Sequence, residues 1–102
     1  MFSIPRVNVI ASDEGFSVEV LGRTGLRYED GDKAVLVDSE VLVAGPYAMV
    51  IYPARLTHWD PPHADEEIDA HARQRILDRI RDAFRFQGFE VTVYGQPQPH
   101  SN

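Results

Sequence analysis

The residues best able to do chemistry gather in one stretch of the chain, around two of its four histidines. His58, Asp60 and His63 lie within six residues, and Asp65 and His71 follow shortly after. Imidazole and carboxylate groups bind zinc, nickel or iron. The spacing matches no known ligand pattern, so we expect no metal and no cofactor. A small metal-binding protein or enzyme that uses His58, Asp60 and His63 stays open as an alternative.

The same stretch holds the only tryptophan, Trp59, followed by a proline pair. Proline fixes its own φ and restricts the preceding residue, so residues 59–62 are predicted to form a stiff, extended connection. A stiff loop suits a recognition surface, and this makes Trp59, Asp60 and His63 candidate partner-binding residues. The alternative role of Trp59 is architectural, as a ring that packs over the start of a helix.

Other combinations give weaker support for catalysis. A serine or threonine beside His58 or His63 could pair a nucleophile with a base, but the chain has no nucleophile elbow. Asp38 and Glu40 would share one face of a strand, where they are typical of surface charge. Residues 22–25 are too short for a phosphate-binding loop and precede no helix. We therefore expect a non-enzymatic protein with no catalytic residue.

Length and composition are those of one small globular domain. The chain has 102 residues, of which 43% are hydrophobic and none is cysteine. We expect a single domain over residues 1–95, in the cytoplasm, since disulfides are excluded and the N-terminus lacks the features of a signal peptide. No segment is long and apolar enough to span a membrane. Residues 96–102 have no apolar side chain to bury and are expected to be disordered.

The charge is acidic, with 16 acidic residues against 10 basic ones and a formal net charge of -6. Proteins that bind nucleic acid usually carry the opposite sign, so this class is disfavoured. Three acids from one crowded part of the sequence, Asp30, Asp38 and Glu40, are further candidates for binding a partner. The simpler interpretation is that these acids belong to a solvated face that keeps the domain in solution.

The elements that must position these residues follow from hydrophobic periodicity. Apolar residues repeat at intervals of three or four over residues 65–87, which predicts one long amphipathic helix capped by Gly88. Asp30-Gly31 predicts a tight hairpin. Strands are expected at residues 7–10, 16–20, 26–28, 34–37, 41–43, 47–52 and 89–94. The predicted fold class is α+β: a curved, mainly antiparallel sheet of about five to six strands on one C-terminal helix, followed by a last strand.

Residues 34–37 and 47–52 are apolar at successive positions, and hence on both faces of a strand. One helix covers only one face of a sheet. A homodimer or partner that covers the second face is therefore expected.

Several short motifs together resemble a family of predicted bacterial immunity proteins, immunity protein 74. The resemblance spans roughly residues 7–94 and rests on these motifs: Val18-Glu19-Val20, Gly22-Arg23, Leu26-Arg27-Tyr28, Asp30-Gly31, Val37-Asp38-Ser39-Glu40, Trp59-Asp60-Pro61-Pro62 and Arg75-Ile76-Leu77 through Gly88. It implies a protein that binds and neutralises a cognate toxin of a contact-dependent or polymorphic toxin system, without chemistry of its own.

If that toxin were a nuclease, its substrate site would be basic, and acids such as Asp38 and Glu40 could occupy it. The alternative from another class is a dimeric nucleic-acid-binding domain of the whirly or coactivator type, which also has several strands followed by a helix. The negative net charge counts against that alternative.

Overall fold

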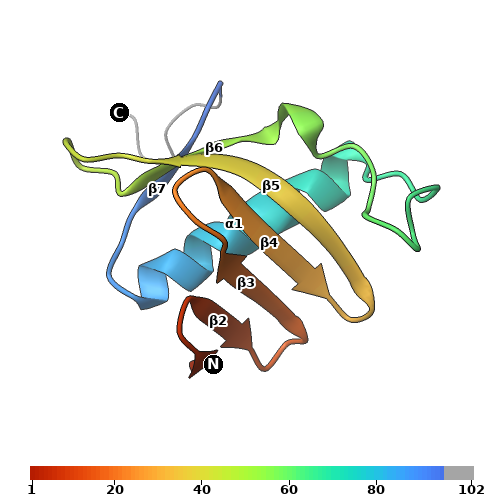
Figure 1. Ribbon diagram of the computed structural model, residues 1–102, viewed down its shortest axis with the longest axis horizontal. Coiled ribbons are helices and arrows are strands. Elements are labelled where there is room, and N and C mark those ends of the chain that lie inside the picture. The colour runs from red at the N-terminus through yellow and green to blue at the C-terminus, as the bar shows by residue number, and fades with distance from the viewer. Residues whose placement is uncertain (96–102) are drawn as a thin grey trace.

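The computed structural model describes residues 1–95, and the tail that we expect to be disordered, residues 96–102, lies outside the described residues. Seven strands form one sheet in chain order, and one long helix lies on one of its faces (Figure 1). The elements are β1 (Phe2–Arg6), β2 (Val9–Ser12), β3 (Phe16–Val20), β4 (Gly25–Asp30), β5 (Lys33–Val41), β6 (Met49–Tyr52), the short 3₁₀ helix η1 (Pro53–Arg55), α1 (Ala70–Phe86) and β7 (Val91–Val93).

Neighbouring strands pair antiparallel from β1 to β6, and β7 alone pairs parallel, with β6. The parallel pair needs a long crossover, which the segment containing α1 supplies. This arrangement confirms the predicted α+β class. The sheet has seven strands instead of five or six. Residues 2–6 add an edge strand that the sequence patterns did not indicate, and the separate segments expected at 34–37 and 41–43 are replaced by one long strand, β5.

The core lies between α1 and the inner face of the sheet. The helix contributes Ile76, Leu77, Ile80, Ala83 and Phe84. Alternate strand residues meet them, as the period of two requires. These inner-face residues are Phe16, Val18, Leu26, Tyr28, Val35, Val37, Met49, Ile51, Val91 and Val93.

The helix begins at Ala70, five residues later than the periodicity predicted. The segment before it is extended instead, because the Ile68 amide donates to the Thr57 carbonyl at 2.7 Å and His58 forms a β-bridge with Glu67. Asp69 then caps the helix, with its carboxylate accepting from the Ala72 amide at 2.7 Å. Neither described helix is long and apolar enough to cross a membrane.

The predicted hairpin turn at Gly31 and the predicted helix cap at Gly88 are confirmed. Gly31 has a φ of 64° in the turn between β4 and β5, and Gly88 has a φ of 87° after α1. At the helix end the Phe89 amide donates to the Phe84 carbonyl and the Gly88 amide to the Arg85 carbonyl, both at 3.0 Å. These two bonds form the Schellman motif, which needs a left-handed residue.

One polar network joins the helix to the sheet. The Arg79 Nη1 donates at 3.0 Å both to the Tyr28 hydroxyl and to Asp30 Oδ2. The same guanidinium lies 4.6 Å from the centre of the Phe16 ring. Burial raises the pKa of the Tyr28 hydroxyl, and the hydrogen bond from Arg79 opposes that rise.

Aromatic rings continue from this network in both directions across the inner face. Tyr28 stacks between Phe16, at 5.9 Å between ring centres, and Trp59, at 6.3 Å. Phe2 contacts Phe16 edge-on at 5.9 Å and Phe86 at 5.5 Å. The network and these rings therefore hold β1, β3, β4 and α1 together.

We predict that Arg79→Met lowers the free energy of unfolding by about 1–2 kcal/mol, because it removes two charge-assisted hydrogen bonds from a partly buried site. Chemical denaturation measures this change. Arg75→Met is the control, since Arg75 is an exposed residue of the same helix. Equal stability losses in the two variants would contradict a special role for Arg79.

Candidate partner-binding site

The structure divides the six predicted partner-binding residues among different surroundings. Asp30 faces the helix and accepts from Arg79. Trp59 is buried, whereas Asp60 and His63 lie on the loop before α1. Asp38 and Glu40 lie together on the outer face of the sheet, opposite to the helix. Only this last pair combines proximity with an open surface.

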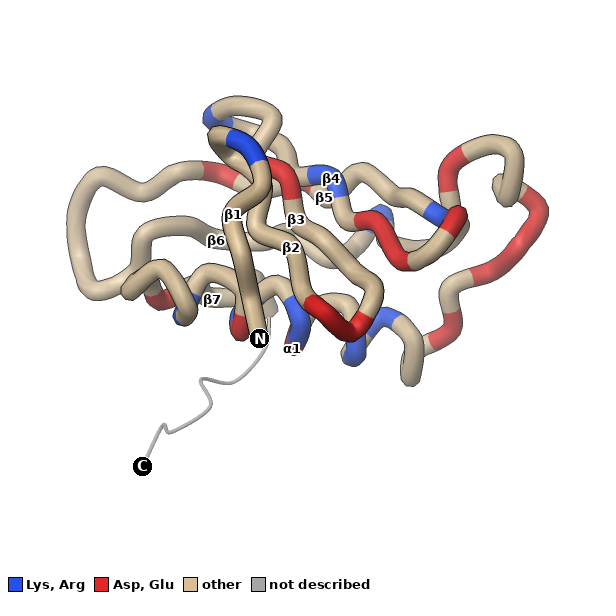
Figure 2. Tube along the Cα trace, turned by 90° about the horizontal axis from the view of Figure 1, so that it is seen from below, with Lys and Arg blue, Asp and Glu red and all other residues tan. Residues whose placement is uncertain are grey.

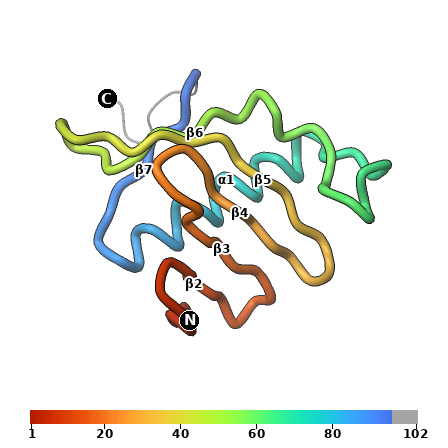
Figure 3. Tube along the Cα trace, in the orientation of Figure 1, coloured from red at the N-terminus to blue at the C-terminus, as the bar shows by residue number. Residues whose placement is uncertain are grey.

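Residues 57–69, which we call the strap, cover the edge of β5 (Figure 3). β6 pairs with β5 only over residues 38–41, which leaves the first half of β5 without a partner strand on that side. The Asp60 amide donates to the Ala34 carbonyl at 2.8 Å and satisfies part of this edge. The prediction of an extended segment is wrong beyond Asp60, since the His63 amide donates back to the Asp60 carbonyl at 2.9 Å and closes a turn.

Trp59 anchors the strap in the core. Its side chain is only 7% exposed, and its ring stacks on Tyr28. The Lys33 Nζ lies 5.8 Å from the ring centre and also pairs with Glu66 at 2.7 Å. The structure therefore supports an architectural role for Trp59.

The two histidines of the strap make separate contacts. His58 is exposed, with its Nδ1 3.3 Å from the Thr57 hydroxyl. The His63 Nε2 lies 3.5 Å from Asp32 Oδ2 in the hairpin turn. Across residues 1–95, no three histidine or acidic side chains are grouped closely enough to hold a metal ion. Within these residues, His58, Asp60 and His63 therefore do not form a three-ligand metal group.

Asp38 forms part of a row of outer-face residues that crosses β4, β5 and β6, and Glu40 lies two residues further along β5, opposite Val50. Register places Gly25 opposite Asp38, and Asp38 opposite Tyr52. Tyr94 continues the row after β7, because its amide donates to the Ile51 carbonyl at 2.8 Å. The two tyrosine rings are 5.5 Å apart, and that of Tyr94 is 68% exposed.

The carboxylates of Asp38 and Glu40 have only weak or uncharged interaction partners within the described part of the chain. Tyr52 donates its hydroxyl to Glu40 Oε1 at 2.9 Å, and this bond raises the pKa of Tyr52 because it favours the protonated phenol. Asp38 Oδ2 lies 3.6 Å from Nε of Arg55, whose side chain is 83% exposed. Within the described part of the chain, Glu40 has no ion-pair partner.

An open hollow of about 440 Å³ lies at these residues. It is lined by Thr24, Asp38, Ser39, Glu40 and Tyr52. We name this hollow, with the adjacent Gly25 and Tyr94, the outer-face site. Its negative charge and aromatic rings suit a cationic side chain better than they suit proton-transfer chemistry.

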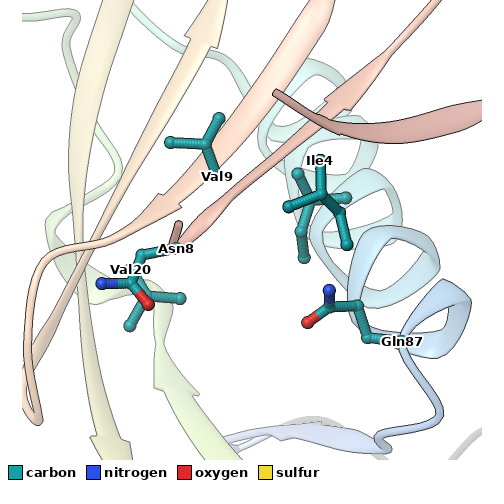
Figure 4. Close-up of a pocket in the computed structure, with 6 residues that line it drawn as sticks. Ile4, Asn8, Val9, Val20 and Gln87 are labelled. Carbon is teal, nitrogen blue, oxygen red and sulfur yellow. The ribbon is translucent and has the colours of Figure 1, made fainter. Parts of the chain in front are cut away.

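A second, smaller cavity lies between the β1–β2 hairpin and the end of α1. Its volume is about 90 Å³, and Figure 4 shows Ile4 and Gln87 across it from Asn8 and Val20. Its lining has apolar side chains and two amides, without a titratable group. This cavity consequently offers no acid or base.

The acidic residues also gather at one end of the molecule. Figure 2 shows them along the strap and the β4–β5 turn, whereas basic residues follow α1.

The outer face of the sheet has both apolar and charged side chains. Leu36 is 54% exposed, but Arg27, Glu29 and Glu40 share that face. It is thus less apolar than the sequence suggested, and a homodimer through it stays a prediction.

The sequence patterns did not indicate a binding role for five members of the outer-face site: Thr24, Gly25, Ser39, Tyr52 and Tyr94. Two of them, Tyr52 and Tyr94, each follow a buried residue, Ile51 and Val93. Their alternation with buried neighbours shows that they share a face, but only strand register shows that they lie beside Asp38 and Glu40.

The fold is that of a small α+β protein that carries two carboxylates and two tyrosines on the outer face of its sheet. Residues 17–94 match immunity protein 74, and the chain belongs to that family. No curated protein matches the chain significantly, and neither does any solved structure.

We predict that Trp59→Ala lowers the free energy of unfolding by about 3–5 kcal/mol, as expected for removing a buried aromatic ring. Thermal or chemical denaturation measures the loss. His58→Ala is the matched control at the neighbouring exposed position and should change stability by less than about 0.5 kcal/mol. A Trp59→Ala variant as stable as the parent would refute the anchoring role.

We predict that Glu40→Gln lowers the pKa of Tyr52 toward its ordinary value of 10.0, because the carboxylate that favours the protonated phenol is lost. The ¹³Cζ chemical shift of Tyr52, followed as the pH rises, measures this pKa. Glu29→Gln serves as the control on the same face. If both variants leave the pKa of Tyr52 unchanged, the hydrogen bond to Glu40 is not present in solution.

Proposed function

We propose that this protein is a cytoplasmic immunity protein that binds and neutralises a cognate bacterial toxin without catalysing a reaction. The observation that carries the proposal is membership of the immunity protein 74 family across residues 17–94. The absence of cysteine suits a reducing compartment.

The outer face supports a binding role. The helix covers the inner face of the sheet, so the outer face stays open to a partner. Asp38 and Glu40 lie there without a strong ion pair, and two tyrosines flank them. We therefore place the centre of the toxin-binding surface at Asp38 and Glu40. Asp60 and His63 on the strap are secondary candidates, and Asp30 and Trp59 act by holding the fold.

The toxin surface that fits this face is basic. A nuclease toxin has such a surface where it binds its own substrate, and an acidic immunity protein would block it by charge complementarity. By contrast, the nucleic-acid-binding alternative has little support, since the arginines of α1 are interspersed with acids such as Asp78 and Asp82.

The test is expression of the protein encoded beside this gene, with and without this chain, in a host that lacks both. We expect the neighbour to arrest growth and this chain to restore it, because a bound toxin cannot reach its target. Colony counts measure the rescue. A harmless neighbour, or an arrest that this chain does not relieve, would contradict the proposal.

The location of the interface is checked with the same pair of proteins. Charge reversal at Asp38 and Glu40 to lysine should abolish rescue, and the measured Kd should rise with salt concentration. Reversal at Asp65 and Glu67 is the matched control, because it changes the net charge equally at the other end of the molecule. Equal effects of the two reversals would remove the outer face from the proposed interface.

A further inference from the structure

We infer that the outer-face site binds an arginine side chain presented by the protein partner. This inference deepens the proposed function and rests on it, since it names the group of the toxin that the surface recognises. It is carried by the shape, the charge and the aromatic rings of the site.

The shape comes from a strand residue without a side chain. Gly25 lies opposite Asp38 in β4, and a Cβ atom built on Gly25 would meet nothing within 4 Å. Its φ is not in the left-handed region, so the backbone there does not require glycine. Gly25 is the first residue of β4, and one reason for a glycine in a strand is the close approach of a ligand. The hollow beside it is thus open space that another molecule can enter.

The charge of the site fits one cationic group. Asp38 and Glu40 are two residues apart on β5 and share the outer face. Their neighbours among residues 1–95 are a phenol hydroxyl and the weakly held Arg55. Two carboxylates offer more acceptor positions than these contacts use, and a guanidinium has five N–H donors in a planar fork.

The aromatic pair favours arginine over lysine. Guanidinium planes stack on aromatic faces, whereas an ammonium group is compact and more strongly hydrated. Tyr52 and Tyr94 lie side by side along the row, and most of the Tyr94 ring is exposed to solvent. A guanidinium that contacts the carboxylates can therefore also stack on a ring.

The chain itself places a guanidinium at this position. Arg55, the last residue of η1, approaches Asp38 to 3.6 Å, but its side chain remains 83% exposed. Exposed pairs of this kind contribute little stability, so an incoming arginine can displace Arg55. Arg55 thus acts as an internal competitor, and its removal should strengthen binding.

The test uses the full chain, labelled with ¹⁵N, and a capped Gly-Arg-Gly peptide as the probe at low ionic strength. We expect saturable amide shifts at Thr24, Gly25, Asp38, Glu40, Tyr52 and Tyr94. The corresponding lysine peptide should bind at least about fivefold more weakly, because it lacks the planar fork. The citrulline peptide, which has a similar shape and no charge, should give no saturable shifts.

Variants distinguish binding at the outer-face site from attraction by the overall negative charge of the protein. Asp38→Asn with Glu40→Gln should abolish binding, whereas Asp65→Asn with Glu67→Gln removes the same charge and should leave it unchanged. Gly25→Val fills the hollow at constant charge and should weaken binding at least about tenfold. Arg55→Gln should tighten binding more than Arg75→Gln, which changes the net charge equally. The amide spectrum of each variant reports whether it is folded.

Absence of shifts at these residues, equal binding of the arginine and lysine peptides, or equal losses from the two acidic double variants would overturn the inference. Different outcomes reject the arginine site and the immunity role. If the toxin is neutralised equally well by the Asp38→Asn, Glu40→Gln variant, the arginine site is wrong and the immunity role stands. If the peptide binds as expected but no toxin is neutralised, the site stands and the immunity role is wrong.

Discussion

The position of the helix on the sheet depends on the contact of Arg79 with Tyr28 and Asp30, which joins α1 to β4 through two hydrogen bonds. A partly buried guanidinium is stable only when its donors are satisfied, and here a phenol and a carboxylate from one strand accept them. The aromatic rings on either side extend this contact from Trp59 to Phe86. Because the network and the rings commit the inner face to the core, the outer face is the one available to a partner.

The strap depends on the same core. Trp59 stacks on Tyr28, and this places the Asp60 amide where it meets the unpaired edge of β5. The proline-containing loop is therefore part of the architecture: it covers a sheet edge that would otherwise expose backbone groups. Its remaining polar groups, such as His63, contact the β4–β5 turn.

The acidic residues consequently have different roles although they resemble one another in sequence. Asp30 satisfies Arg79, and Asp69 caps the helix. Asp38 and Glu40 contact only Arg55 and the Tyr52 hydroxyl in the salt bridges and side-chain hydrogen bonds found among residues 1–95, and we propose that they bind the partner. The net charge of -6 thus combines charges that hold the fold with charges that are available to a partner.

The sequence by itself determined the features that depend on near neighbours. The helix followed from apolar residues one turn apart, and the hairpin and helix cap followed from Gly31 and Gly88, where the backbone needs a positive φ. The α+β class followed from the order of these elements, and short motifs indicated the family. Tertiary structure alone decided the start of the helix, where pairing between Thr57 and Ile68 competes with the first helical turn. It also decided which acids meet: Asp30 faces the helix, whereas Asp38 lies in the hollow beside Gly25 and Tyr52, because the face and neighbours of a strand residue are set by register between distant segments.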